Sequence, residues 1–191
     1  MPDHIIRTAH PADAAALAAL KRPYVEDTPY NFAYEPPNPA EFSAEIERTL
    51  ERYPFLVAET VRGPGADGLG ARGRILGYAQ AEPFRAREAD GWNVELTIYL
   101  AKDARGRGVG RALYAELLRI LAAQGVQNAY ACVTASNAAS LAFHAALGFT
   151  EVGRFPATGY KLGAWHETVY LWRALGGHEA PPRAFTPFPL L

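Results

Sequence analysis

The feature that most constrains this chain is an apolar strand that passes through a glycine-rich basic loop directly into a helix. The strand ends at Leu100, glycines follow at 106, 108 and 110, and the helix is expected over 109–124. Glycines at alternate positions let the backbone approach a ligand and turn its N–H groups inward. The positive end of the helix dipole points to the same place. The run therefore predicts a site for a phosphate or pyrophosphate group.

Two better-known phosphate-binding loops do not fit this run. A P-loop ends in Gly-Lys-Ser/Thr, whereas this loop ends in Gly110-Arg111-Ala112. The dinucleotide fingerprint needs glycines at its first, third and sixth positions, and the sixth position counted from Gly106 is Arg111. The remaining pattern is Arg105-x-x-Gly108-x-Gly110. From the residues alone, a solvated Arg/Gly loop that caps a helix or binds RNA stays open as an alternative.

Composition limits the class of protein. With 191 residues, 49% of them hydrophobic, the chain is long enough for one domain with a substantial core. A net charge of −1 does not favour a nucleic-acid partner. The single cysteine, Cys132, excludes an intrachain disulfide, and neither a signal-peptide pattern nor an apolar run of membrane-spanning length is present. We therefore expect a cytoplasmic protein that does not span a membrane.

Hydrophobic periodicity predicts a mixed α/β sheet in a single domain over 1–175, followed by a Pro-rich tail over 176–191. Asn38 and either Ser136 or Asn137 are expected as helix N-caps, and Pro23 is expected just beyond the end of the first helix. A glycine-rich hairpin connection is predicted over 62–73. Strands are predicted over 4–8, 55–59, 75–82, 94–100, 126–134, 150–154 and 167–172, and helices over 11–21, 39–52, 109–124 and 137–147.

The glycine loop resembles the acyl-CoA pyrophosphate loop of the GNAT superfamily of acyltransferases. The spacing Asn137-x-x-Ser140-x-x-x-His144-x-x-Leu147-Gly148-Phe149 resembles the next element of that superfamily. Longer strings resemble one subfamily, the phosphinothricin (methionine sulfoximine/sulfone) N-acetyltransferases. They are Tyr30-Asn31-Phe32, residues 51–59, Pro83-Phe84-Arg85-Ala86-Arg87, residues 94–99 and, most specifically, residues 159–167 with the sequence GYKLGAWHE.

The resemblance implies an enzyme that uses acetyl-CoA to acetylate the α-amino group of a small amino acid or analogue, by direct transfer in a ternary complex. It also implies a homodimer. The residues that it assigns to the cofactor are the strand backbone of Ile98, Tyr99 and Leu100, the loop residues Arg105, Gly106, Arg107, Gly108, Val109, Gly110 and Arg111, and Asn137 near the thioester.

Acyl transfer to an amine needs a base, because most aliphatic amines are charged at neutral pH. The resemblance places that base at Glu95, on an otherwise apolar strand where burial would raise the pKa of a carboxyl group. The alternative is that Glu95 lies on a solvated strand face. His144 occupies the place of a proposed acid for the departing thiolate. A helical histidine is more often structural, so Tyr99 and Tyr170 remain possible substitutes.

The residues expected at the amino-acid substrate are Arg85 and Arg87, as clamps for a carboxylate and a phosphinate or sulfone oxygen, with Phe32, Glu95, Tyr160 and Lys161. Asp90 departs from the aromatic residue that phosphinothricin-specific members tend to have, which weakens the case for phosphinothricin itself. The alternatives are a GNAT enzyme for another amine (a protein N-terminus, a polyamine or an aminoglycoside) and a non-catalytic acetyl-CoA-binding module. The five histidines show no metal-site spacing, and no metal is expected.

Overall fold

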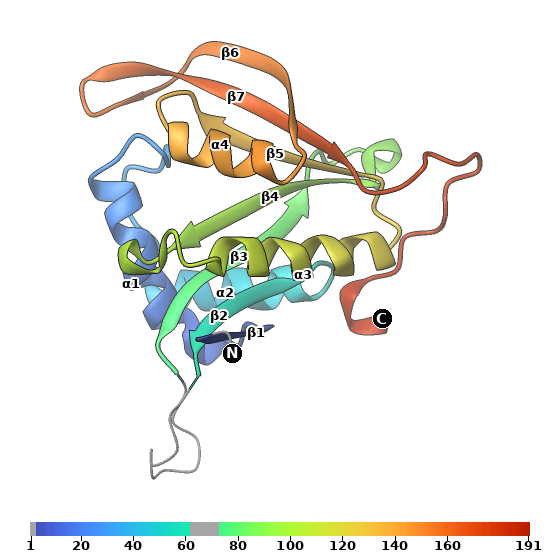
Figure 1. The fold of residues 1–191 in the computed structure, drawn as a ribbon, viewed down its shortest axis with the longest axis horizontal. Helices are drawn as coiled ribbons and strands as arrows, with labels where there is room; N and C mark the ends of the chain where they lie inside the picture. The colour runs from blue at the N-terminus through green and yellow to red at the C-terminus, as the bar shows by residue number, and fades with distance from the viewer. Residues whose placement is uncertain (1–2, 62–72) are drawn as a thin grey trace.

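The computed structural model describes residues 3–61 and 73–191, which are arranged around one seven-stranded sheet (Figure 1). The predicted connection over 62–73 lies outside the described residues except for Gly73. The strand order is β1-β2-β3-β4-β5-β7-β6, and all neighbours are antiparallel except β4 and β5. The strands are β1 (His4–Thr8), β2 (Phe55–Thr60), β3 (Ile75–Pro83), β4 (Asn93–Leu100), β5 (Asn128–Thr134), β6 (Thr150–Lys161) and β7 (Ala164–Ala174).

Helices cover both faces of the sheet (Figure 1). One face packs on α1 (Ala14–Glu26) and α2 (Pro39–Leu50), and the other on α3 (Val109–Ala123) and α4 (Ala138–Ala146). Strand residues alternate between the two cores. Val57 pairs with Tyr78 on the α1/α2 face, whereas Leu56 pairs with Ala79 on the α3/α4 face. The mixed α/β sheet and the order of helices and strands predicted from the sequence are therefore confirmed.

Helices α2 and α4 begin next to the side-chain caps that the sequence predicts. The Asn38 side chain accepts hydrogen bonds from the backbone N–H groups of Ala40 and Glu41, and Glu41 in turn accepts one from the Asn38 backbone. This reciprocal pair satisfies amides that the first helical turn leaves free. Asn137, not Ser136, caps α4 by accepting from the Ser140 amide.

The first helix differs from the prediction at both ends. A short 3₁₀ turn, η1 (Pro11–Asp13), precedes α1, and α1 then continues through Pro23 to Glu26. Proline inside a helix removes one backbone hydrogen bond. The extra turn is stabilised by the full burial of Val25 and by a hydrogen bond of 2.6 Å from the Tyr24 hydroxyl to the carbonyl oxygen of Leu100.

The last two strands are longer than predicted and form a hairpin that extends past the helices (Figure 1). A two-residue turn, Leu162-Gly163, joins them with φ of 50° and 79°, which is the conformation of a type I′ hairpin turn. The register shifts between Phe155 and Gly159, where Ala157 has a φ of 52°. Because β6 is an exposed edge strand with a bulge, its sequence lacks the alternation that would have predicted its length.

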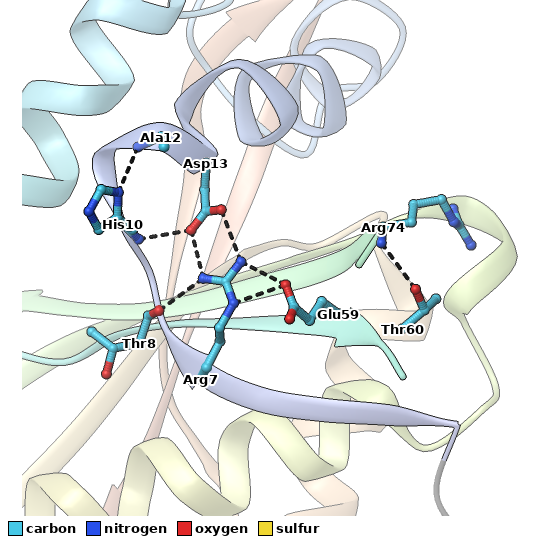
Figure 2. Close-up of polar contacts among 8 residues, drawn as sticks. All are labelled: Arg7, Thr8, His10, Ala12, Asp13, Glu59, Thr60 and Arg74. Atoms are coloured by element: carbon cyan, nitrogen blue, oxygen red, sulfur yellow. Dashed lines mark hydrogen bonds and ion pairs between the residues drawn. The ribbon is translucent and has the colours of Figure 1, made fainter. Parts of the chain in front are cut away.

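A charged cluster ties the N-terminal turn to the sheet (Figure 2). The Arg7 guanidinium donates to both carboxylate oxygens of Asp13 (2.8 and 2.9 Å) and to Glu59 (2.9 and 2.7 Å). The Asp13 side chain is almost fully buried and also accepts from the His10 amide at 2.8 Å. Buried charges are tolerated when they are paired and hydrogen-bonded, so this cluster fixes the start of η1 against β1 and β2.

The C-terminal segment that follows β7 lies over the end of α3 and the start of β2. The carbonyl of Arg183 accepts from Trp92 Nε1 (2.8 Å), and the Thr186 amide donates to the carbonyl of Gln124 (2.8 Å). The Phe185 ring packs edge-on against Tyr53 at 5.4 Å. Phe185 and Phe188 of the predicted tail are therefore partly buried and pack against the core of the predicted domain.

Candidate active site

The centre of the candidate site is a gap inside the sheet. The parallel pair β4–β5 is in register only from Asn93–Asn128 to Glu95–Tyr130, and among the described residues no pairing continues beyond it. Figure 1 shows β4 and β5 close together at one end and apart at the other. A cavity of about 100 Å³ occupies this gap, which we call the slot. Residues of both strands and of α4 line it, including Glu95, Thr97, Ile98, Cys132, Asn137 and His144.

Separation of the strands leaves part of the β4 backbone without a sheet partner. Leu100 exposes both its carbonyl and its amide on this side, because each contacts the Tyr24 hydroxyl (2.6 and 3.4 Å). The next residue, Ala101, donates to Leu76 on the β3 side. Since backbone directions alternate along a strand, Ile98 also faces the slot, whereas the backbone of Tyr99 faces β3. Of the three predicted backbone contacts, Ile98 and Leu100 are thus placed to meet a ligand in the slot.

A groove of about 260 Å³ leads from the slot to the glycine loop on the α3/α4 face. Apolar and aromatic side chains form most of its walls, and the loop backbone forms one end. The lining residues are Tyr24, Tyr30, Ile98, Leu100, Arg105, Gly106, Asn137, Ala139, Ser140 and Phe143. An elongated, mostly apolar arm with a charged end fits this shape and chemistry.

The glycine loop has the geometry of an anion site. Gly106 and Gly108 have φ of 73° and 80°, a region that residues with a Cβ rarely adopt. Gly108 is also the N-cap of α3, and it supplies no side-chain hydrogen bond to the first amides of that 15-residue helix. Those amides therefore point outward with the positive end of the helix dipole, where a phosphate is stabilised.

The other loop residues divide into ligand-facing and structural groups. Arg105 lines the groove and donates to the Tyr24 hydroxyl at 2.7 Å, whereas Arg107 forms an exposed ion pair with Asp3. Val109 is buried in the core. Gly110 lies against Leu100 and Phe143 so closely that an added Cβ would be 3.2 Å from both. Arg111 is exposed on the first turn of α3.

Glu95 lies where β4 and β5 separate, and it is half-buried. Burial raises the pKa of its carboxyl group, and the charge of Glu82 raises it further. Its charge also raises the pKa of two neighbours, Cys132 and Tyr170, although burial contributes more to both. A carboxyl group with a raised pKa in a cavity has the properties that a general base needs near neutral pH.

His144 lies at the inner end of the slot and is 2% exposed. Its Nδ1 is 2.8 Å from the carbonyl oxygen of Ser140, and its Nε2 is 3.0 Å from the hydroxyl of Tyr114. Because a carbonyl only accepts, Nδ1 carries the hydrogen and Nε2 accepts from Tyr114. Burial lowers the pKa of His144, opposed by the Ser140 hydrogen bond. The ring is therefore held neutral in one orientation.

A larger pocket, of about 570 Å³, opens on the α1/α2 face of the sheet beside Glu95. Aromatic rings form its walls: Phe84 stacks on Tyr130 at 4.1 Å, and Tyr170 packs edge-on against Phe155 at 5.2 Å. Its polar side chains other than the tyrosine hydroxyls are Arg85, Cys132, Thr158 and Thr168. Burial is the main cause that raises the pKa of Tyr170 to about 12, so its hydroxyl stays protonated at neutral pH.

Three of the predicted substrate residues meet around this pocket and three do not. Phe32 and Arg85 line it, and Glu95 lies at its boundary with the slot. Arg87 is the exposed residue before the turn η2 (Glu88–Asp90) and is not among the residues that line this pocket, the slot or the groove. Asp90 lines an adjoining cavity with Arg85. An acid beside Arg85 agrees with the doubt that the sequence raises about phosphinothricin.

Lys161 and Tyr160 have structural contacts instead. The Lys161 side chain is buried and donates to the carbonyls of Asn31 and Ala33 (2.6 Å to Ala33), and burial lowers its pKa. Tyr160 is half exposed, and its carbonyl accepts from the Tyr34 hydroxyl at 2.6 Å. Both residues therefore hold the loop that carries Phe32 rather than lining the pocket.

Several residues of the site carry no local sequence signal. Tyr24 and Tyr114 lie on helices where an aromatic residue is read as core, and Tyr130 and Phe155 lie on strands that reach the pocket only through sheet pairing. Among the described residues, no group of histidine, cysteine or acidic side chains could hold a metal ion. No helix in this part of the chain is long and apolar enough to cross a membrane.

Comparisons with known proteins agree with this geometry. The acetyltransferase (GNAT) domain family matches residues 6–170. The chain is 38% identical to the phosphinothricin N-acetyltransferase of Streptomyces viridochromogenes, over 95% of this chain and 93% of that protein. It is 32% identical to the L-methionine sulfoximine/L-methionine sulfone acetyltransferase of Pseudomonas aeruginosa, over 93% and 98%. Among solved structures, a phosphinothricin acetyltransferase from Sinorhizobium meliloti in complex with acetyl-CoA is similar with a TM-score of 0.85, 32% identity and 98% coverage of both chains.

Proposed function

This chain belongs to the GNAT acetyltransferase family and is an acetyl-CoA-dependent N-acetyltransferase; from that premise we propose that its acceptor is the α-amino group of a small amino acid or analogue of the methionine sulfone, methionine sulfoximine or phosphinothricin type. The observation that carries the proposal is the position of Glu95. It lies at the slot, between a groove that suits an acyl-CoA on one face and an aromatic pocket with one arginine on the other.

The groove residues fit acetyl-CoA, which supplies the acetyl group as a thioester. The uncapped amides of α3 and the Gly106–Gly108 backbone suit the pyrophosphate, and Arg105 adds a positive charge. The backbone of Ile98 and Leu100 has no partner strand on this side and suits the amide groups of the pantetheine arm, which would share the Leu100 groups with the Tyr24 hydroxyl. Asn137 uses its Oδ1 to cap α4, which leaves its Nδ2 to donate into the slot.

In the proposed reaction, Glu95 removes a proton from the acceptor ammonium group, directly or through one water molecule. The free amine attacks the thioester carbonyl carbon, a C–N bond forms, and the carbon–sulfur bond breaks. The Ile98 N–H is a donor for the carbonyl oxygen as it becomes negative. As the carbon–sulfur bond breaks, the nitrogen loses a second proton and becomes an amide. Of the two protons lost, one is balanced by protonation of the departing thiolate, and Glu95 releases the other to solvent.

His144 remains the predicted source of the thiolate's proton, with a condition that the geometry adds. Its Nε2 accepts from Tyr114, so it has to gain a proton before it can act as an acid, and the Tyr114 hydroxyl then has to turn. The two substitutes remain predictions. Tyr99 lines the slot and accepts from the Asn31 side chain at 2.7 Å, which leaves its own O–H free to donate, and Tyr170 lies in the acceptor pocket.

The acceptor pocket favours an anionic amino acid over a cationic amine. Arg85 suits the α-carboxylate, the threonine hydroxyls are available to sulfone or phosphinate oxygens, and the aromatic walls suit the aliphatic part of the side chain. A polyamine or an aminoglycoside would place positive charge beside Arg85. A non-catalytic acetyl-CoA-binding module would not need a carboxylate at position 95.

The test is release of CoA thiol from acetyl-CoA with methionine sulfone, methionine sulfoximine, phosphinothricin, unmodified amino acids and a panel of cationic amines. We expect saturable turnover with the first group and little with the cations. Glu95→Gln is expected to abolish turnover and to leave the Kd for acetyl-CoA unchanged in calorimetry. Glu47→Gln, an exposed change of the same charge on α2, is the control. Activity confined to cations, or full turnover by Glu95→Gln, would reject the proposal.

Two further expectations from the sequence remain predictions. We expect a homodimer, which analytical ultracentrifugation would test. We also expect the enzyme to work in the cytoplasm, where acetyl-CoA and a reducing environment for Cys132 are available.

A further inference from the structure

Two glutamates face each other across neighbouring strands on the α1/α2 face of the sheet. Glu82 of β3 and Glu95 of β4 are direct partners in the antiparallel register. Side chains at such a position point to the same face, with Cβ atoms about 4.5–5.5 Å apart. Like charges directly opposite each other destabilise a sheet. An acidic pair at this position therefore has a cost in stability, and one of its members is the proposed base.

We propose that Glu82 is a positioning residue of the acetyl-transfer reaction, which acts through Glu95 by opposing its negative charge and by carrying its proton to solvent. The inference rests on the proposed role of Glu95. It adds a residue that contacts neither reactant and that the functional assignment does not use.

The surroundings of Glu82 suit this role. The residue is solvent-exposed and is not among the residues that line the slot, the groove or the acceptor pocket. Partial shielding of its carboxyl group raises its pKa, and the charge of Glu45 on α2 raises it further. Lys21 of α1 and Arg48 of α2 act in the opposite direction and lower the pKa. Glu45 is itself held by the Gln80 side chain at 2.6 Å.

The other groups around Glu95 cannot replace this acid. The slot and the pocket beside it contain no second carboxyl group among the described lining residues. Their other titratable or charged side chains are Tyr24, Tyr30, Tyr99, Tyr114, Cys132 and His144 in the slot, and Arg85, Tyr130 and Tyr170 at the pocket. Glu82 is thus the negative group that acts on Glu95 from the neighbouring strand.

The position of Glu82 also provides a route by which the proton on Glu95 reaches solvent. Each turnover leaves one proton on Glu95, and the slot and pocket beside it are occupied by the reactants. Glu82 lies on the adjacent strand and opens to water outside both cavities. A proton that passes from Glu95 to Glu82, directly or through water, reaches solvent without crossing the space that the reactants fill.

The first test compares the pH dependence of kcat/KM in the wild type and in Glu82→Gln, which keeps the shape and removes the charge. Without the opposing carboxylate, Glu95 ionises more easily, so the acidic limb moves to lower pH. On that limb, activity relative to the plateau is expected to rise about 1.5- to fivefold. Plateau kcat is expected to fall, because proton exit is slower, while KM for acetyl-CoA stays constant. Glu82→Asp should restore most of the wild-type profile, and Glu47→Gln should reproduce it.

A second measurement does not depend on finding an acceptor. The Glu95 side-chain carboxyl carbon is titrated by ¹³C NMR in the wild type and in Glu82→Gln, with Glu95→Gln to assign the signal. A lower midpoint in Glu82→Gln supports the inference even if none of the tested amines is acetylated. An unchanged midpoint, or an acidic limb that moves as much in Glu47→Gln, overturns it.

Discussion

The hydroxyl of Tyr114 donates a hydrogen bond to Nε2 of His144 at 3.0 Å, and the opposite nitrogen of the ring donates to the Ser140 carbonyl. Both ring nitrogens are thereby used in a buried position. Burial is the main cause that lowers the pKa of His144 in the folded state.

This arrangement predicts a pH-dependent loss of stability. An unfolded histidine takes up a proton below a pH of about 6.5, whereas His144 in the folded state does so only at lower pH. The stability contributed by His144 is complete above 6.5 and is lost as the pH falls toward the folded-state pKa. In that window the free energy of unfolding should decrease by up to about 1.4 kcal/mol per pH unit more in the wild type than in His144→Asn. Urea unfolding at pH 7.5, 6.5 and 5.5 measures it, and equal slopes would contradict it.

Removing the hydroxyl of Tyr114 should distinguish a structural role of His144 from a catalytic one. Tyr114→Phe leaves Nε2 of His144 without its donor and is expected to lower the free energy of unfolding by about 1–3 kcal/mol. If His144 is the acid, freeing Nε2 also shifts the basic limb of the kcat profile. A destabilised variant with an unchanged pH profile would assign His144 a structural role.

Gly108 should be essential for acetyl-CoA binding. Its φ of 80° and its place at the start of α3 require a residue without a Cβ. Gly108→Val is expected to raise the Kd for acetyl-CoA at least about tenfold, or about 1.4 kcal/mol. Gly163→Val is the matched control, because Gly163 has a φ of 79° at the distant hairpin turn. Unchanged affinity in calorimetry, or an equal loss in the control, would contradict the loop assignment.

Arg7 should be a large contributor to stability although it lies outside the site. Arg7→Met leaves the buried carboxylates of Asp13 and Glu59 without the guanidinium that binds both, so we expect a loss of about 3–5 kcal/mol. Arg22→Met removes an exposed pair with Glu26 and should change stability by less than about 0.5 kcal/mol. Urea unfolding at low temperature compares the two. Similar losses would show that the cluster contributes no more than a surface pair.

Gly159 should control the acceptor pocket through Phe32. A Cβ at position 159 would overlap the Phe32 ring, so Gly159→Ala has to displace that ring from the pocket wall. We expect KM for the acceptor to rise about threefold or more, with the Kd for acetyl-CoA unchanged. In a Phe32→Ala background the same substitution should add nothing. Additive effects would show that Gly159 acts by another route.

The parts of the fold that sequence reasoning predicts are those that local chemistry decides. Asn38 and Asn137 begin helices because their side chains bond the amides that follow. The glycine loop is predictable because a backbone with positive φ favours glycine, so individual glycines in the sequence mark such positions. The extra turn of α1 beyond Pro23 was missed, because Val25 and Tyr24 stabilise it by contacts with residues far along the chain.

The same distinction between local chemistry and long-range contacts applies to the residues of the candidate site. Arg105 and Gly108 follow from a contiguous motif. The partnership of Glu95 with Glu82 depends on the register of two strands, and that of His144 with Tyr114 depends on how α3 and α4 pack. Lys161 was predicted at the substrate, but its ammonium group is buried against backbone carbonyls. Charge and position in the sequence do not show which neighbours a side chain will meet.

The slot lies within the sheet and not at its edge, so both of its sides are braced. β3 pairs with the whole length of β4, and β7 pairs with the whole length of β5. The width of the opening is therefore inherited from the hydrogen-bonding pattern of four strands, while the walls of the acceptor pocket come partly from the Phe32 loop and the β6–β7 hairpin. We therefore expect changes in that loop and hairpin to alter which amine is accepted without altering its distance from the acyl donor. The distance between the two reactants and the selection of the amine thus depend on separate parts of the molecule, so the second can change while the first is kept.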